Sequence, residues 1–216
     1  MSAEDTLDRL VDDAIALADR APRAVLGIAG SPGTGKSTLV ECLLARIAQR
    51  RGSGWAAHVP MDGFHLADAQ LRRLGTLDRK GAPETFDPAG YAHLLERVRD
   101  ETQTEVYVPG FDRDLEQPLA AALVVLPGVR LVITEGNYLL LDTEPWARAR
   151  RAMDRVWFVE SAESLRLDRL VAPDAGPRRT RLREGPPTDS GRLRRPVLVW
   201  PRPQHVRRGR AVRRDR

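Results

Sequence analysis

The chain begins with apolar residues that lie three or four positions apart, with Asp and Arg between them. These positions are Leu7, Leu10, Val11, Ala14, Ile15 and Ala18. The period predicts an amphipathic helix over residues 2–20. The next apolar run, residues 25–29, is short and continuous, which is typical of a buried parallel strand. Helical spacing returns between residues 36 and 50, so a helix should follow this strand.

The same alternation continues as far as residue 171. Short apolar runs predict strands at residues 55–60, 106–108, 121–126, 131–134 and 156–159. Helical spacing predicts helices at residues 66–74, 91–99 and 164–170. Because strands alternate with helices, we predict an α/β fold around a mostly parallel sheet.

The periodicity stops at Ala172, after which Pro, Arg and Gly dominate. Residues 172–216 hold fourteen Arg and four acidic residues, whereas residues 1–171 carry a net charge of −5. The overall charge of +5 therefore comes from the last part of the chain. We predict a domain over residues 1–171, which includes the helix within residues 1–20, and a basic tail over residues 172–216. The tail has too little apolar surface to offset the entropy of ordering, so we expect it to be poorly ordered.

The tail contains no Lys, Asn, Ile, Met, Phe or Tyr. GC-rich DNA gives this bias when it is translated in a wrong frame, so we hypothesise that the chain is frameshifted from about residue 172. The alternative is a basic arm that binds nucleic acid or an acidic partner. Trp200 is the one aromatic residue of the tail, and such a composition does not favour nucleic acid as a partner.

Length and cysteine content narrow the class of protein further. A chain of 216 residues fits one domain with at most a small appendage. Cys42 is its single cysteine, the first twenty residues lack the pattern of a signal peptide, and no run of eighteen apolar residues occurs. We therefore expect a cytoplasmic protein with no internal disulfide and no membrane partner.

Residues 30–37 read Gly-Ser-Pro-Gly-Thr-Gly-Lys-Ser and match the phosphate-loop pattern G-x-x-x-x-G-K-[ST]. The loop lies between a predicted strand and a predicted helix, as this motif requires. Its backbone N–H groups cradle phosphates, the lysine reaches the β- and γ-phosphates, and the serine hydroxyl holds Mg²⁺. We therefore predict ATP and Mg²⁺ as cofactors. The predicted nucleotide-binding residues of this segment are Gly30, Ser31, Gly33, Thr34, Gly35, Lys36, Ser37 and Thr38.

A phosphate loop alone leaves ATPases, GTPases and kinases open. The base-reading motif of GTPases contains a lysine, and neither Lys36 nor Lys80, the two lysines of the chain, lies in one. ATPases usually place Asp-Glu after the Walker B strand, whereas the corresponding apolar strand here is followed by Thr134, Glu135 and Gly136. These differences favour a kinase.

Three more motifs follow the phosphate loop in order. They are Val-Pro-Met-Asp-Gly-Phe-His at residues 59–65, Arg-Lys-Gly-Ala-Pro-Glu-Thr-Phe-Asp at 79–87 and Ile-Thr-Glu-Gly-Asn-Tyr at 133–138. With the phosphate loop they resemble the phosphoribulokinase/uridine kinase family of P-loop kinases. The second motif is also similar to bacterial type I pantothenate kinase. Residues 109–113 and Glu-Gly-Asn-Tyr resemble a branch of nucleoside/nucleotide kinase-like or fructose-operon kinase-like proteins.

The resemblance covers about residues 24–171. It implies a P-loop NTPase-type three-layer sandwich and transfer of the γ-phosphoryl group of ATP to a hydroxyl of a small metabolite. A nucleoside, a pantothenate-like acid and a sugar all remain open as acceptors. Members of this family often form dimers or tetramers, so a homodimer is a further expectation.

Two carboxylates are predicted to act with Lys36 in catalysis. The resemblance implies that Asp62 is the general base for the acceptor hydroxyl, a ligand of Mg²⁺, or both; the alternative is a turn residue. Glu135 ends the strongest apolar strand, where ligands bind in open parallel sheets, so it is predicted to hold the Mg²⁺ water shell. The alternative for Glu135 is a solvated carboxylate. Ser37, Asp62 and Glu135 are thus the predicted metal-binding residues.

The remaining candidates surround the acceptor or close over ATP. Besides Asp62, the candidate substrate-binding residues are His65, Arg79, Lys80, Arg113, Asn137 and Tyr138. For each of these a purely structural role, in a loop, a surface ion pair or packing, stays open. Arg166 and Arg169 lie three residues apart, and the resemblance implies that they are lid arginines. His58, His93 and Cys42 are interpreted as structural, and no Cys/His spacing indicates a zinc site.

The tail also gives an alternative to an active enzyme. Relatives continue past the predicted lid helix with further regular structure, whereas this chain turns into the Pro/Arg-rich tail. The alternative is a non-catalytic or weakly active nucleotide-binding protein that lacks a complete lid.

Overall fold

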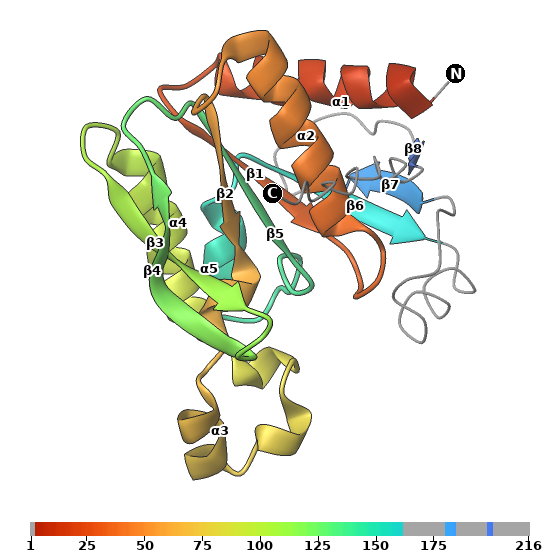
Figure 1. Cartoon of the computed structure of the whole chain (residues 1–216). Helices are drawn as coiled ribbons and strands as arrows, with labels where there is room; N and C mark the ends of the chain where they lie inside the picture. Colours follow the sequence, from red (N-terminus) through yellow and green to blue (C-terminus); the bar gives the residue numbers. More distant parts are fainter. Residues whose placement is uncertain (1–2, 162–179, 185–197, 201–216) are drawn as a thin grey trace, which may run out of the picture.

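The computed structural model describes residues 3–161, 180–184 and 198–200, and a mostly parallel sheet forms its centre (Figure 1). The strands of this sheet, in spatial order, are β2 (Ala56–Pro60), β5 (Leu131–Gly136), β1 (Ala24–Ala29), β6 (Arg155–Ser161), β7 (Thr180–Glu184) and β8 (Leu198–Trp200). β1 pairs in parallel with β5 and β6, and β2 pairs in parallel with β5. β7 and β8 continue the sheet in antiparallel pairing.

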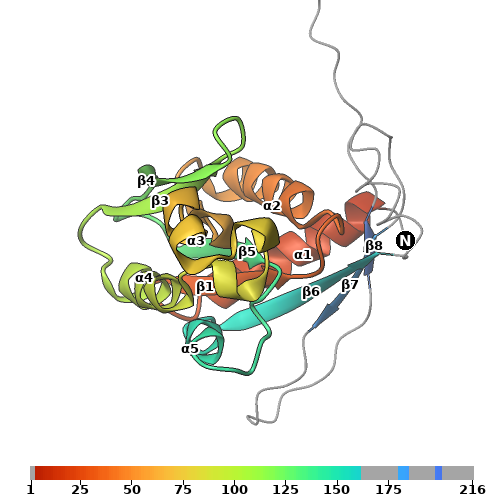
Figure 2. The same ribbon diagram turned by 90° about the horizontal axis from the view of Figure 1, so that it is seen from below.

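Helices cover both faces of the sheet (Figures 1 and 2). The α-helices are α1 (Ala3–Ala18), α2 (Lys36–Arg51), α3 (Asp68–Leu74), α4 (Pro88–Asp100) and α5 (Trp146–Arg151). The short 3-10 helices are η1 (Met61–Phe64), η2 (Leu77–Arg79) and η3 (Pro83–Thr85). α1 and α2 share one apolar core with the sheet, and α4 and α5 share the other. The predicted α/β three-layer sandwich is thereby confirmed.

β1 shows why its sequence is a continuous apolar run rather than an alternating one. Leu26 and Ile28 lie in the core beneath α1 and α2, whereas Val25 and Ala29 lie in the core beneath α4 and α5. Every residue of β1 is buried because both faces of the strand are covered.

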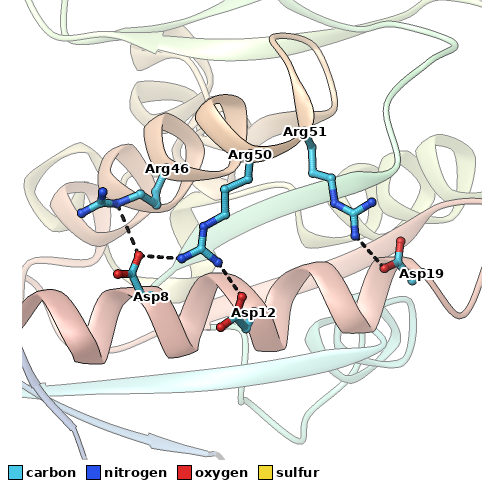
Figure 3. Close-up of polar contacts among 6 residues, drawn as sticks. All are labelled: Asp8, Asp12, Asp19, Arg46, Arg50 and Arg51. Atoms are coloured by element: carbon cyan, nitrogen blue, oxygen red, sulfur yellow. Dashed lines mark hydrogen bonds and ion pairs between the residues drawn. The ribbon is translucent and has the colours of Figure 1, made fainter.

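α1 packs its apolar stripe on the sheet and turns a row of aspartates toward α2 (Figure 3). The predicted apolar positions of α1 are all buried. Arg50 of α2 reaches two of the aspartates, with distances of 2.7 Å to Asp8 and 2.5 Å to Asp12. Arg51 lies 3.0 Å from Asp19. These pairs are partly exposed, so each contributes little stability, and the buried apolar stripe sets the orientation of α1.

The predicted strands at residues 106–108 and 121–126 are present, but they lie outside the central sheet. They form an antiparallel hairpin of β3 (Val106–Asp112) and β4 (Gln117–Val125). The hairpin packs on η1 at Gly63, where an added Cβ would lie 2.3 Å from the carbonyl oxygen of Pro109. This close approach needs glycine, and it brings the hairpin to the carboxyl end of β2.

Arg23, which precedes β1, is 2% exposed, and within the described residues its guanidinium donates five hydrogen bonds to backbone carbonyls. Its guanidinium contacts Val98 O at 2.7 Å and Glu101 O at 2.8 Å, at the end of α4. It also contacts three carbonyls of the loop before β5, namely those of Leu126, Pro127 and Val129 at 2.9, 3.1 and 2.8 Å. Arg23 therefore joins the end of α4 to the loop that leads into the central strand.

Several predictions differ from the structure or lie beyond its described part. α1 ends at Ala18, and α5 was not predicted, because its short Arg-rich sequence has no apolar period. The predicted helix at residues 164–170 lies outside the described residues. Within residues 172–216 the structure describes β7 and β8 alone. The prediction that this tail is poorly ordered or frameshifted stays a prediction. None of the described helices is long and apolar enough to cross a membrane.

Candidate active site

The phosphate loop connects the carboxyl end of β1 to the first turn of α2. Gly35 has φ of 91° and precedes Lys36 at the start of α2, a conformation that favours glycine. At Gly30 an added Cβ would lie 2.5 Å from the carbonyl oxygen of Val159 on the neighbouring strand β6. The loop can therefore adopt this path only with glycine at both positions, and it leads directly into the N-terminus of α2, the end of a helix that favours anions.

Lys36 is 9% exposed, and its ammonium is held inside the loop. Its Nζ donates to Ser31 O at 3.1 Å and to Asn137 Oδ1 at 2.8 Å. Burial lowers the pKa of Lys36, and the nearby carboxylates of Glu135 and Asp62 act in the opposite direction. Asn137 thus contacts the lysine of the phosphate loop, and its predicted contact with the acceptor stays a prediction.

Ser37 of α2 and Glu135 of β5 are in direct contact. Ser37 Oγ donates to Glu135 Oε2 at 3.0 Å. Burial raises the pKa of Glu135, while Ser37 and Lys36 lower it. A hydroxyl and a carboxylate are oxygen donors of the kind that Mg²⁺ takes, with phosphates and water completing its coordination. Within the described residues, no group of three or more His, Cys, Asp or Glu could hold a metal.

Asp62 lies in η1, directly after β2, and its side chain is 39% exposed. Arg113, near the tip of the hairpin, places Nη2 3.7 Å from Asp62 Oδ2. The charge of Asp62 acts on the pKa of both Lys36 and Glu135, which places all three groups in one electrostatic site. The structure thus brings the three predicted catalytic residues to the same edge of the sheet.

His58 is a residue of this site that the sequence interpretation took as structural. It lies on β2, and its Nε2 is 3.6 Å from Glu135 Oε1. Burial lowers the pKa of His58 to about 4, so the imidazole is neutral at neutral pH. The sequence alone does not mark His58 as part of a site. Its proximity to Glu135 depends on how β2 and β5 are aligned, and that alignment is known only from the structure.

Aromatic side chains form a cluster next to Asp62. His65 Nδ1 lies 2.8 Å from the carbonyl oxygen of Asp62. The His65 ring packs against Phe86 and Phe111, with centroid distances of 4.0 and 4.8 Å. Tyr138 joins this cluster through Phe86 at 5.5 Å, and its hydroxyl donates to Gly81 O at 2.5 Å.

Lys80 and Arg79 are engaged in ion pairs within this region. Lys80 Nζ is 2.7 Å from Asp68 Oδ1 and also contacts the carbonyl oxygen of Glu116. It therefore ties α3 to the tip of the hairpin. Arg79 pairs with Glu84 and is largely exposed. Their predicted contact with substrate stays a prediction, and Arg166 and Arg169 lie outside the described residues.

The fold and the site define a P-loop kinase, and comparisons with known proteins agree. The chain is 36% identical over 151 residues to a Schizosaccharomyces pombe protein named "Putative uridine kinase C227.14", covering 68% of this chain and 64% of that protein. It is 37% identical over 118 residues to "ATP-dependent kinase-like protein notR'" of Aspergillus versicolor, covering 51% of this chain and 69% of that protein.

A solved structure, the "putative fructose transport system kinase" of Silicibacter sp. TM1040, superimposes with a TM-score of 0.69 at 36% identity. The match covers 80% of this chain and 81% of that one. No family model matches the chain. Because it is similar to these proteins, the chain belongs to the phosphoribulokinase/uridine kinase family of P-loop kinases. It spans just under two thirds of the length of the Schizosaccharomyces pombe protein.

Proposed function

We propose that the protein transfers the γ-phosphoryl group of ATP to a hydroxyl of a small metabolite. The observation that supports this most is the convergence of Lys36, Ser37, Glu135 and Asp62 at the carboxyl ends of β1, β5 and β2. Such a transfer uses a lysine in the phosphate loop and a serine paired with a carboxylate. It also uses a second carboxylate near the acceptor, which is Asp62 in this proposal.

Each group has a distinct part in this transfer. Lys36 neutralises charge on the β- and γ-phosphates, and Mg²⁺ held at Ser37 and Glu135 supplies further charge neutralisation when bound. Asp62 accepts the proton of the acceptor hydroxyl while the hydroxyl oxygen forms its bond to the γ-phosphorus. The bond between the γ-phosphorus and the bridging oxygen breaks, and ADP leaves with that oxygen. In this scheme Arg113 leaves its ion pair with Asp62 when the acceptor enters.

The acceptor site lies between η1, the hairpin and the loop after β5. His65, Phe111 and Tyr138 line it in this proposal, and Arg79, Lys80 and Asn137 border it. The relatives named "Putative uridine kinase C227.14" and "putative fructose transport system kinase" support a nucleoside and a sugar as acceptor classes in this proposal. A pantothenate-like acid is proposed as a third class from the resemblance of residues 79–87.

The remaining expectations complete the proposal. Residues 1–171 form the kinase domain, Arg166 and Arg169 belong to its lid, and the protein is a cytoplasmic homodimer. A second candidate function, a nucleotide-binding protein with little or no turnover, is supported by the break in the family pattern at residue 172. Resequencing the gene tests whether residues 172–216 are native.

An acceptor panel separates the two candidate functions. ADP formation from ATP and Mg²⁺ is measured with nucleosides, pantothenate-like acids and sugars. Lys36→Ala should lower turnover by about 100-fold or more, because it removes a charge aimed at the transferring group. Asp62→Asn should lower it by about 100- to 10,000-fold. His93→Gln, on the exposed side of α4, is the control. Acceptor-independent or Asp62-independent turnover would contradict the proposed mechanism.

A further inference from the structure

His58 and Glu135 lie on neighbouring strands and face the same side of the sheet. β2 and β5 pair in parallel with Pro60 opposite Glu135 and His58 opposite Ile133. Alternate residues of a strand share a face, so His58 and Glu135 lie on the face that carries Ile133. Ile133 belongs to the core beneath α1 and α2. This is also the face covered by α2, in whose first turn Ser37 lies.

The two oxygens of the Glu135 carboxylate face different groups. Oε2 accepts from Ser37 Oγ at 3.0 Å, and Oε1 lies 3.6 Å from His58 Nε2. That nitrogen is buried and has no hydrogen-bond partner among the described residues. A carboxylate fixed at one oxygen can still rotate about its last bond, whereas a donor on the second oxygen fixes the plane of the group.

The ring nitrogen Nε2 of a histidine donates a hydrogen bond to a carboxylate oxygen when it carries the ring proton. Partners of this kind orient the groups that hold a metal and its water shell.

We propose that His58 is a positioning residue. Its Nε2, 3.6 Å from Glu135 Oε1 and without a hydrogen-bond partner among the described residues, closes on that oxygen when Mg²⁺ and nucleotide bind, and so keeps Oε2 facing Ser37 and the water shell of Mg²⁺. The proposal rests on the proposed function, since it assigns Ser37 and Glu135 to the metal. In this proposal His58 acts through Glu135 and not on the nucleotide or the acceptor. A side chain that only filled space at this position would need no nitrogen directed at Glu135.

The test measures how much Mg²⁺ strengthens ADP binding, by calorimetric titration with Mg²⁺ and again with EDTA. His58→Leu keeps a similar volume and removes the donor, whereas His58→Gln keeps a donor of similar reach. The measured quantity is the ratio of the ADP affinity with Mg²⁺ to the ADP affinity with EDTA. In His58→Leu we expect this ratio to fall by about 10-fold or more, while the affinity for metal-free ADP stays at the wild-type value. His58→Gln should restore most of the strengthening, and His93→Leu, in an exposed position, should behave as the wild type.

Two results would overturn the positioning role while leaving the kinase proposal intact. One is His58→Leu with the full strengthening by Mg²⁺. The other is an equal loss of ADP binding with and without Mg²⁺ that His58→Gln does not restore, which would indicate a role in folding alone. A wild-type protein whose ADP affinity ignores Mg²⁺ would instead contradict the assignment of Ser37 and Glu135, and the positioning role would fail with it.

Discussion

Replacing Arg23 by Met should destabilise the fold, although Arg23 has no part in the proposed chemistry. Met has a similar length and keeps most of the packing, so the change chiefly removes the guanidinium. The five carbonyl oxygens that now accept from Arg23 would lose that donor. They belong to the end of α4 and to the loop before β5, two segments that Arg23 holds together.

The size of the effect follows from which carbonyls are buried. The hydrogen bonds to Val98 O and Val129 O are buried, and the other three are partly buried. A buried acceptor without a donor costs about 1–3 kcal/mol, which gives about 4 kcal/mol for two. Avoiding the desolvation of the guanidinium offsets part of this, leaving a loss of about 3 kcal/mol. For a domain of this size, that lowers Tm by about 6–12 °C.

Urea unfolding followed by circular dichroism measures the loss. Arg23→Lys should be intermediate, because an ammonium has three donors where the guanidinium has five. Arg20→Met, in an exposed position at the end of α1, is the matched control and should change stability by less than about 0.5 kcal/mol. If Arg23→Met lost less than about 1 kcal/mol with an unchanged m value, the carbonyls would not depend on Arg23 and the reasoning would be refuted.

Three further predictions test other parts of the structure. Burial raises the pKa of Glu135 above its ordinary 4.5, so its ionised form costs stability as pH rises past that value. Glu135→Gln should therefore unfold at a higher temperature than the wild type at pH 7, with a gap that closes below about pH 4. Gly63→Ala should lose about 1–3 kcal/mol and lower turnover, because its Cβ would displace the backbone at Pro109; thermal unfolding and ADP release measure both. Arg50→Ala should lose about 0.5–1 kcal/mol in urea unfolding, a loss that shrinks between about 0.1 and about 1 M NaCl.

The parts of the site that the sequence predicts are those encoded by local pattern. The phosphate loop follows a fully buried strand and opens a helix, so Lys36 and Ser37 could be placed from residues 25–50 alone. Glu135 could be placed because it ends a continuous apolar run, and such runs form the central strands of a sheet covered on both faces. Asp62 needed the resemblance, since Asp-Gly after a short run is equally typical of a turn.

The parts that escaped prediction depend on contacts distant in sequence. Residues 106–108 and 121–126 have the apolar character of strands, but apolar character does not say which sheet a strand joins. Arg23 acquires its role from carbonyls that lie 75 to 106 residues further along the chain. Nothing in the sequence around Arg23 marks it as buried, because arginine is usually exposed.

The order of strands explains why one carboxylate can serve the whole site. β5 lies between β2 and β1, so the side chain at its carboxyl end has neighbours from both adjoining strands. On the β1 side, the phosphate loop leads into α2 and brings Ser37 to one oxygen of Glu135. On the β2 side, His58 Nε2 lies 3.6 Å from the other oxygen, and the chain then continues to Asp62. A carboxylate on β2 or β1 would lack one of these neighbours, so under the proposed function the acid that faces Mg²⁺ is best placed on β5, between them.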